Sequence, residues 1–281
     1  MPVQWVPLVA SFVVAAAITP TTVRTLAAHG FTRVNYRGAP VAFPAGIALV
    51  VPAMVALVVV APLYELVDLD VLQPGAGLAF IYVFGVGFLG LLDDLLGSAE
   101  GQPRGWRGHI GALAGGHVST GVLKALGALG LALLVAANPA LDAGDYLLSA
   151  AVLVLATNVF NLLDLRPGRA GKAFILLGAG LVLGSGDLDP FWTVGLFVAP
   201  ILVLLPLDLR ELGMLGDTGS NVIGAIAGVW LILTLETTLA LAIAAALLAL
   251  ITVYGEFRSI SAVVERTPGL RQLDLLGRSH V

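Results

Sequence analysis

The stretch SNVIGAIAGVWLILTLETTLALAIAAALLALITVY, residues 220–254, carries a single charged residue, Glu236. As one continuous helix it would extend about 50 Å, because an α-helix rises about 1.5 Å per residue. The hydrocarbon core of a bilayer is only about 30 Å thick. We therefore expect two membrane-spanning helices, at 220–235 and 237–254, that meet near Glu236.

The composition of the whole chain supports this interpretation. Of the 281 residues, 58% are hydrophobic and only 11% are charged, whereas a soluble domain carries about a quarter charged residues. The sequence therefore predicts an all-α, polytopic transmembrane bundle that forms a single integral membrane domain, residues 1–281. The absence of cysteine excludes disulfides and thiolate metal sites.

Apolar runs recur along the chain at regular intervals. They cover residues 3–23, 43–63, 77–92, 122–137, 146–163, 170–183, 191–207, 220–235 and 237–254. A spanning helix needs about 17 to 25 residues, and several runs are shorter, the run at 170–183 most of all. We expect about nine spans, the first of them retained, because no basic segment precedes it and no cleavage pattern follows it.

The basic residues test this topology. In a chain with nine spans, every Lys and Arg falls on one side of the membrane, while the other side carries acids such as Glu65 and Asp187. Because cytoplasmic loops are enriched in Lys and Arg, we expect a multi-pass protein of the cell (plasma) membrane with its N-terminus outside and its C-terminus cytoplasmic. The basic residues are Arg24, Arg33, Arg37, Arg104, Arg107, Lys124, Arg166, Arg169, Lys172, Arg210, Arg258, Arg266, Arg271 and Arg278.

An aspartate pair ends the third apolar run. In FLGLLDDLLGS, residues 88–98, Asp93 and Asp94 are adjacent. A helix C-terminus carries partial negative charge, and neighbouring carboxylates repel each other. The pair is either a simple helix stop at the interface or half of a site for a cation such as Mg²⁺, which prefers oxygen ligands.

A second polar segment is NVFNLLDLRPGRAGK, residues 158–172. Asn158 and Asn161 share a helix face, with Asp164 one step further along it. Polar groups at the end of an apolar helix usually face a bundle interior or a cavity, so this face favours a functional site. The basic residues around the Pro-Gly turn that follows are Arg166, Arg169 and Lys172, and ordinary inside-positive charge also explains them.

The third segment is MLGDTGSN, residues 214–221, which leads into the eighth apolar run. Asp217, Thr218 and Ser220 are all good N-cap residues, and Asn221 follows them. A glycine-rich turn into a helix N-terminus is also an anion site, because free N–H groups and the helix dipole favour negative charge there. The sequence leaves both interpretations open.

Two weaker signals lie on the same side of the membrane. Lys124, near the start of the fourth run, is either a snorkelling lysine or a phosphate contact. NYRGAPVAFPAGIA, residues 35–48, is either a loop near a lipid head group or only a turn. Together with the acids above, these groups suit a metal-assisted reaction between a nucleotide diphosphate from the cytosol and a phosphate on a membrane lipid.

These segments, in this order, resemble the polyprenyl-phosphate N-acetylhexosamine-1-phosphate transferase family, which includes the bacterial translocase that makes the first lipid intermediate of peptidoglycan. LGLLDDLLG resembles its aspartate-pair motif, NVFNLLD its Asn-x-x-Asn-Leu-x-Asp motif, and MLGDTGSN its Gly-Asp-Thr-Gly-Ser motif. YRGAPVAFPAGIA is similar to its Gly-x-Pro-x-x-Gly-Gly segment. The resemblance covers roughly residues 31–226.

The resemblance implies a reaction in which a sugar-1-phosphate, of the N-acetylhexosamine type, passes from a UDP-sugar to a polyprenyl phosphate with release of UMP, a step of cell wall biogenesis. It implies Mg²⁺, with Mn²⁺ as an alternative, held by Asp217 with help from Asp94. Asp93 would act as a base for the lipid phosphate. The implied catalytic residues are Asp93, Asp94, Asp164 and Asp217, and the implied substrate-binding residues are Lys124, Asn158, Asn161, Arg166, Arg169, Thr218, Ser220 and Asn221.

The chain also departs from the family pattern. Pro167 stands where the family often has a second Asp, and the late histidine-rich motif is missing, since His280 is the only histidine of the C-terminal tail. The alternative is therefore a non-catalytic relative that binds, transports or regulates polyprenyl phosphate. The expected partners are the lipid, the UDP-sugar and the membrane; no nucleic acid is expected, and a homodimer is left open.

Overall fold

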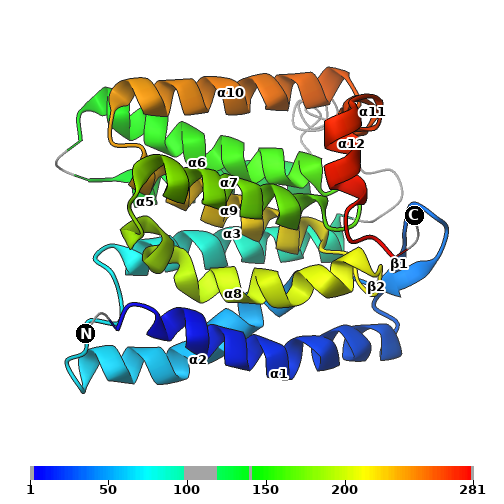
Figure 1. Ribbon diagram of the computed structural model, residues 1–281, viewed down its shortest axis with the longest axis horizontal. Helices are drawn as coiled ribbons and strands as arrows, with labels where there is room; N and C mark the ends of the chain where they lie inside the picture. The colour runs from blue at the N-terminus through cyan, green and yellow to red at the C-terminus, as the bar shows by residue number, and fades with distance from the viewer. Residues whose placement is uncertain (1–2, 98–118, 139–140, 280–281) are drawn as a thin grey trace.

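The computed structural model describes residues 3–97, 119–138 and 141–279, and the chain is 76% helical. The long helices lie side by side and run along one common direction (Figure 1). Each predicted apolar run overlaps one of them, with ends that differ by a few residues: α1 (Val6–Ala28), α2 (Ile47–Glu65), α3 (Ala76–Leu96), α5 (Thr120–Ala136), α6 (Ala143–Leu163), α7 (Arg169–Ser185), α8 (Asp189–Leu209), α9 (Gly216–Thr234) and α10 (Thr238–Phe257). Arg104, Arg107 and His280 lie outside the described residues.

Seven of the described helices are long and apolar enough to cross a membrane, namely α1, α2, α3, α6, α8, α9 and α10. The helices α5 and α7 have 17 residues each. The stretch that opened the sequence analysis divides as predicted: α9 ends at Thr234, and the Thr237 side chain caps α10 by accepting a bond from the Ala240 N–H. The prediction of an all-α, multi-pass membrane bundle is confirmed at this level.

Helix α9 lies in the centre of the bundle. It is the most buried of the candidate spans, because 78% of its 18-residue apolar segment is buried inside the protein. It packs against α2, α3, α6, α7 and α8. By contrast, only 11% of the 18-residue apolar segment of α10 is buried. The start of α9 therefore has helix ends on several sides, and their side chains can reach it.

A short hairpin connects α1 to α2. Strands β1 (Thr32–Val34) and β2 (Pro40–Ala42) pair antiparallel, and β2 then runs beside the segment that precedes α9. The Met214 N–H donates to the Ala42 carbonyl at 2.9 Å, and the Ala45 N–H donates to the Met214 carbonyl at 2.7 Å. The hairpin thus fixes the entry into α9 to the entry into α2.

The first residues of α2 and α9 touch backbone to backbone. A Cβ atom at Gly46 would overlap the backbone of Gly219, and it would also lie 2.7 Å from the Leu215 carbonyl oxygen. Only glycine at position 46 permits this approach, because backbone cannot move aside as a flexible side chain can. The segment 35–48, which the sequence left as a loop or a turn, is therefore a wall of the α9 entry.

Two short helices follow α10. Helix α11 (Ile260–Arg266) and helix α12 (Pro268–Leu275) lie across the end of the bundle, and α12 runs crosswise to the long helices (Figure 1). The hairpin lies at the same end (Figure 1). Consistent with the sequence analysis, no tenth long helix follows α10 in the described part of the chain.

Replacing Gly46 with alanine should destabilise the protein by about 1–3 kcal/mol or more, because the new methyl group overlaps the α9 backbone. The matched control is Gly180→Ala in α7, where an added Cβ meets nothing within 4 Å. Thermal unfolding in detergent would measure both. Equal melting temperatures for the two variants would show that α2 and α9 are not closely packed.

Candidate functional site

Asp94 caps helix α9 from a neighbouring helix. Its carboxylate accepts bonds from the Asp217 N–H at 2.9 Å, the Thr218 N–H at 2.8 Å and the Thr218 hydroxyl at 2.6 Å. The first N–H groups of a helix have no partner within it, and the residue before α9, Leu215, supplies no side-chain cap. Gly216 has a φ of 68°, and a Cβ there would lie 2.6 Å from the Asp94 carboxylate. The glycine at position 216 therefore leaves the space that the Asp94 carboxylate occupies.

These contacts differ from the predicted role of Asp94 as a metal ligand. The side chain is only 6% exposed, and three hydrogen bonds from α9 engage both its oxygens. A carboxylate at a helix N-terminus is favoured by the helix dipole as well as by these bonds. We therefore assign Asp94 to holding Asp217 in place.

Asp93 faces a different partner. The Lys124 ammonium donates to the Asp93 carboxylate at 2.8 Å and also bonds the Asp217 carboxylate. All three side chains are between 19% and 29% exposed, so the cluster is accessible. Three segments that are far apart in the sequence thus meet at one ammonium group, as the placement of these residues on one side of the membrane predicted.

Two predicted substrate-binding residues serve the local structure. The Thr218 hydroxyl donates to Asp94, and the Ser220 hydroxyl donates to the Gly216 carbonyl at 2.9 Å. Both residues are 1% exposed. These contacts agree with the capping interpretation of MLGDTGSN. Both hydroxyl groups donate within the protein and not toward a substrate site.

The asparagines line a large cavity beside the cluster. The Asn161 side-chain amide donates to the side-chain Oδ1 of Asn221 at 3.1 Å, and the Asn158 amide donates to the Thr252 hydroxyl at 3.2 Å. Together with Asp93 and Lys124 they line a cavity of about 750 Å³ between α3, α5, α6, α9 and α10. Most of its remaining lining is apolar, namely Val86, Leu89, Val122, Ala125, Ala128, Val154, Leu155, Val253 and Phe257. The cavity therefore has a polar end and an apolar body.

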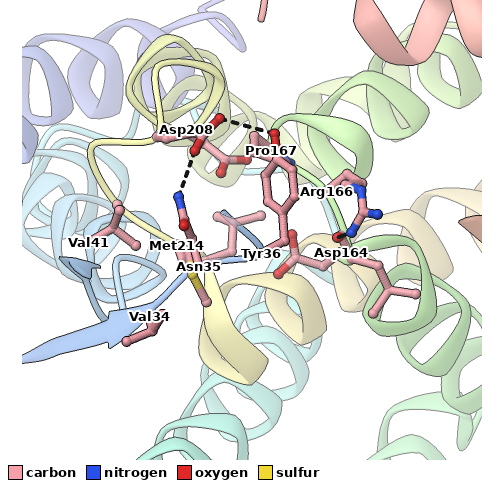
Figure 2. Close-up of a pocket in the computed structure, with 13 residues that line it drawn as sticks. Val34, Asn35, Tyr36, Val41, Asp164, Arg166, Pro167, Asp208 and Met214 are labelled. Carbon is pink, nitrogen blue, oxygen red and sulfur yellow. Dashed lines mark hydrogen bonds between the residues drawn. The ribbon is translucent and has the colours of Figure 1, made fainter. Parts of the chain in front are cut away.

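Asp164 and Arg166 line a second, smaller cavity of about 100 Å³, on the hairpin side (Figure 2). The Arg166 guanidinium lies 4.6 Å from the centre of the Tyr36 ring and pairs with Glu265 at 3.5 Å. The structure thus divides the predicted site into two neighbouring cavities.

Glu211, which lines the second cavity, was not among the predicted site residues. Its carboxylate accepts bonds from the Asn35 amide at 2.6 Å and the Tyr36 hydroxyl at 3.2 Å. It is one of two non-glycine residues with positive φ in the described chain, at 56°. The quoted segment 35–48 contained both donors, but nothing in the sequence pointed to their shared acceptor.

Asp164 lies close to several other acids. Burial raises the pKa of its carboxyl well above the ordinary value, and the charges of Asp208, Asp217 and Asp94 raise it further. Like charges act in this way only at short range or in poorly solvated surroundings. Asp164 therefore lies within electrostatic reach of Asp94 and Asp217.

Arg169 is committed to the C-terminal segment. Its guanidinium binds both oxygens of Asp274, at 2.8 and 3.0 Å, and donates to the Ser261 hydroxyl at 2.9 Å. Arg169 and Asp274 are only 6% and 7% exposed, and Arg278 also binds Asp274, at 2.7 Å. These bonds hold α11 and α12 against α7, and the substrate contact predicted for Arg169 stays a prediction.

The donor chemistry of the Asp93–Lys124–Asp217 cluster fits a divalent metal ion. Mg²⁺ is usually bound by one or two carboxylates and by oxygens of its phosphate substrates. Asp93 and Asp217 already share one cation, the Lys124 ammonium, which marks where positive charge is stabilised. No group of three or more His, Cys, Asp or Glu residues suited to a metal occurs among the described residues, so substrate oxygens would have to complete the shell.

Comparison with known proteins adds no family assignment. No family model matches the chain, and no curated protein sequence matches it significantly. Support for a function therefore comes from the motifs and from the contacts described above.

Replacing Asp94 with asparagine should loosen the start of α9, because the amide offers an N–H where α9 needs an acceptor. We expect a loss of about 1–2 kcal/mol of local stability and roughly tenfold faster hydrogen exchange of the amides of Asp217 and Thr218. Asp142→Asn is the control, since Asp142 caps α6 at the other end of the bundle and asparagine caps equally well. Unchanged exchange at the start of α9 in Asp94→Asn would contradict the capping role.

The ion pair between Arg169 and Asp274 should make the attachment of the C-terminal segment sensitive to acid. Burial alone would raise the pKa of Asp274, but the hydrogen bonds and charge of Arg169 outweigh this effect, with help from Arg278, and hold the pKa below its ordinary value. The pair therefore stabilises the fold above the ordinary pKa of about 4, and this stabilisation is lost as the pH falls through the lowered pKa.

We expect Asp274→Asn to weaken the attachment of α11 and α12 at neutral pH by on the order of 3 kcal/mol, because it leaves Arg169 buried without its partner. Limited proteolysis of the C-terminal segment would measure this, with the exposed Asp70→Asn as control. The difference from the wild type should shrink below about pH 4. A difference that stays constant down to pH 2 would contradict the ionised pair.

Proposed function

We propose that the chain is a metal-dependent transferase that moves a sugar-1-phosphate from a UDP-sugar to a polyprenyl phosphate and releases UMP. It would cross the cell membrane nine times, α5 and α7 included, with its N-terminus outside and its active site at the cytoplasmic face. The distribution of Lys and Arg along the sequence supports this orientation.

The observation that carries the proposal is the meeting of Asp93, Lys124 and Asp217 at one point. Carboxylates and an ammonium group at the mouth of a membrane bundle suit phosphoryl transfer, in which catalysis consists mainly of positioning the reactants and stabilising charge. Asp93 and Asp217 come from two of the motifs that carry the resemblance, and Lys124 is one of the substrate-binding residues that it implies. Convergence of this kind is what a shared active site requires.

The large cavity supports a lipid acceptor. Its apolar body suits an isoprenoid chain, and Lys124 at its polar end would bind the lipid phosphate. Asn158 and Asn161 line the same polar end and can donate to phosphate or sugar oxygens. We assign this cavity to the polyprenyl phosphate.

The smaller cavity supports a nucleotide donor. Asn35, Tyr36 and Glu211 present hydrogen-bonding groups to it, and Arg166 lies at its edge. The ion pair of Arg166 with Glu265 has a half-exposed partner, and exposed pairs are weak, so Arg166 can turn toward a diphosphate. The side chain of Asp164 lies in the lining of this cavity.

In the proposed reaction an oxygen of the lipid phosphate forms a bond to the phosphorus that carries the sugar. The bond from that phosphorus to the oxygen bridging to the uridine-bearing phosphate breaks, and UMP leaves with the bridging oxygen. Asp93 accepts the proton if the lipid phosphate arrives protonated, and Lys124 orients its oxygens. Mg²⁺ or Mn²⁺, held by Asp217 and Asp93, would neutralise charge on the phosphates.

One observation favours a second candidate, a non-catalytic protein that binds, carries or regulates polyprenyl phosphate. The Lys124 ammonium already pairs with both carboxylates that would hold the metal ion, as it would in a site that works without a metal. Pro167 in place of a second Asp and the missing histidine motif point the same way.

One assay separates the two candidates. Purified protein is incubated with Mg²⁺, polyprenyl phosphate and a panel of UDP-sugars, and UMP release is measured. We expect turnover that falls by about 100-fold or more in Asp217→Asn and in Asp93→Asn, in line with the loss of a charge-stabilising group. Asp187→Asn, at the opposite end of the bundle, is the control and should retain activity. Tight lipid binding without UMP from any donor would reject the enzyme and favour the second candidate.

A further inference from the structure

Helix α12 carries a stripe of exposed leucines. Leu270, Leu273 and Leu276 are 45%, 45% and 66% exposed. Their spacing of three residues places them on one side of a helix, with Leu276 directly after its last residue. Three large apolar side chains in a row on an eight-residue helix require a partner or an apolar environment.

The stripe cannot turn toward the protein. Asp274 lies on the side that faces α7, and two arginines hold it there. In addition, the Lys172 ammonium donates to the carbonyl oxygens of Leu273 and Leu276, at 2.9 and 3.2 Å. These bonds fix the rotation of α12 about its axis. Leu270, four residues before Asp274, lies at the edge of the buried side, whereas Leu273 and Leu276 lie further round the helix and stay exposed.

The position of α12 indicates what covers the stripe. The helix runs crosswise to the membrane-spanning helices, at the end of the bundle (Figure 1), which is the orientation of an amphipathic helix in the plane of a membrane surface. It follows α10, whose outward surface is apolar and exposed up to Phe257. The apolar surface that α10 presents to lipid therefore leads directly into α11 and α12.

The charges nearby are complementary to phospholipid. Arg258 and Arg266, at the two ends of α11, are both exposed, and basic residues beside a membrane are attracted to anionic head groups. The acid between them, Glu265, is 58% exposed and lies 3.5 Å from the Arg166 guanidinium. A bilayer surface therefore matches both the leucines and the arginines.

We propose that α12 docks on the bilayer surface, with Leu270, Leu273 and Leu276 among the lipid head groups and Arg258 and Arg266 near their phosphates. The ion pair of Arg169 and Asp274 holds this helix at the membrane surface. The inference rests on the membrane bundle and is independent of the proposed transfer reaction.

The chain contains no cysteine, so one introduced thiol can be labelled uniquely. The test uses Leu273→Cys and Leu276→Cys, each carrying an environment-sensitive fluorophore, in vesicles of phosphatidylcholine and phosphatidylglycerol. Arg271→Cys is the matched control, because Arg271 lies on the opposite side of α12. Leu250→Cys, on the exposed side of α10, is the positive reference. All four replaced side chains are exposed, so the fold should be retained, and thermal unfolding checks this.

Spin-labelled lipids with the nitroxide near the head group should quench the labels at 273 and 276 about twofold or more strongly than the label at 271, as expected for an interfacial helix. Equal quenching at 273 and 271 would overturn the proposal. So would a label at 273 that is shielded from an aqueous quencher without being quenched by lipid, because a protein partner or a second copy would then cover the stripe.

Discussion

The hydrogen bonds that the start of α9 donates to the Asp94 carboxylate hold the candidate site together. Near a bilayer, little water is available to satisfy the free N–H groups of a helix end, and an unsatisfied group costs several kcal/mol. Asp94 supplies these bonds from α3, and in doing so it fixes the backbone of Asp217. The adjacent Asp93 is left to face Lys124, so neighbouring aspartates have separate tasks.

This division resolves the electrostatic conflict in FLGLLDDLLGS. Two carboxylates at the C-terminal end of α3 are unfavourable in isolation. In the folded protein Asp94 lies at the N-terminus of α9, where the dipole has the opposite sign, and Asp93 pairs with an ammonium. Each carboxylate is thus stabilised by a different neighbour, and the pair depends on α9 and α5 being in position.

Much of this arrangement was predictable, because hydropathy defines the helices and the one-sided Lys and Arg distribution places the polar motifs together. The sequence could not assign Asp93 and Asp94 to different partners, since adjacent residues on a helix are both near the same end. Nor could it pair Arg169 with Asp274, or Asn35 with Glu211, which are 105 and 176 residues apart. Such contacts depend on tertiary packing and leave no periodic pattern.

The charge of the cluster bears on how the proposed reaction would be organised. Two carboxylates and one ammonium give Asp93, Asp217 and Lys124 a net charge of −1. With a divalent cation bound, the same cluster would carry +1 and would attract a phosphate, whereas without it the site repels one. A phosphate that binds Lys124 also draws the ammonium away from the carboxylates and frees their oxygens. Cation and phosphate binding should therefore reinforce each other at this site.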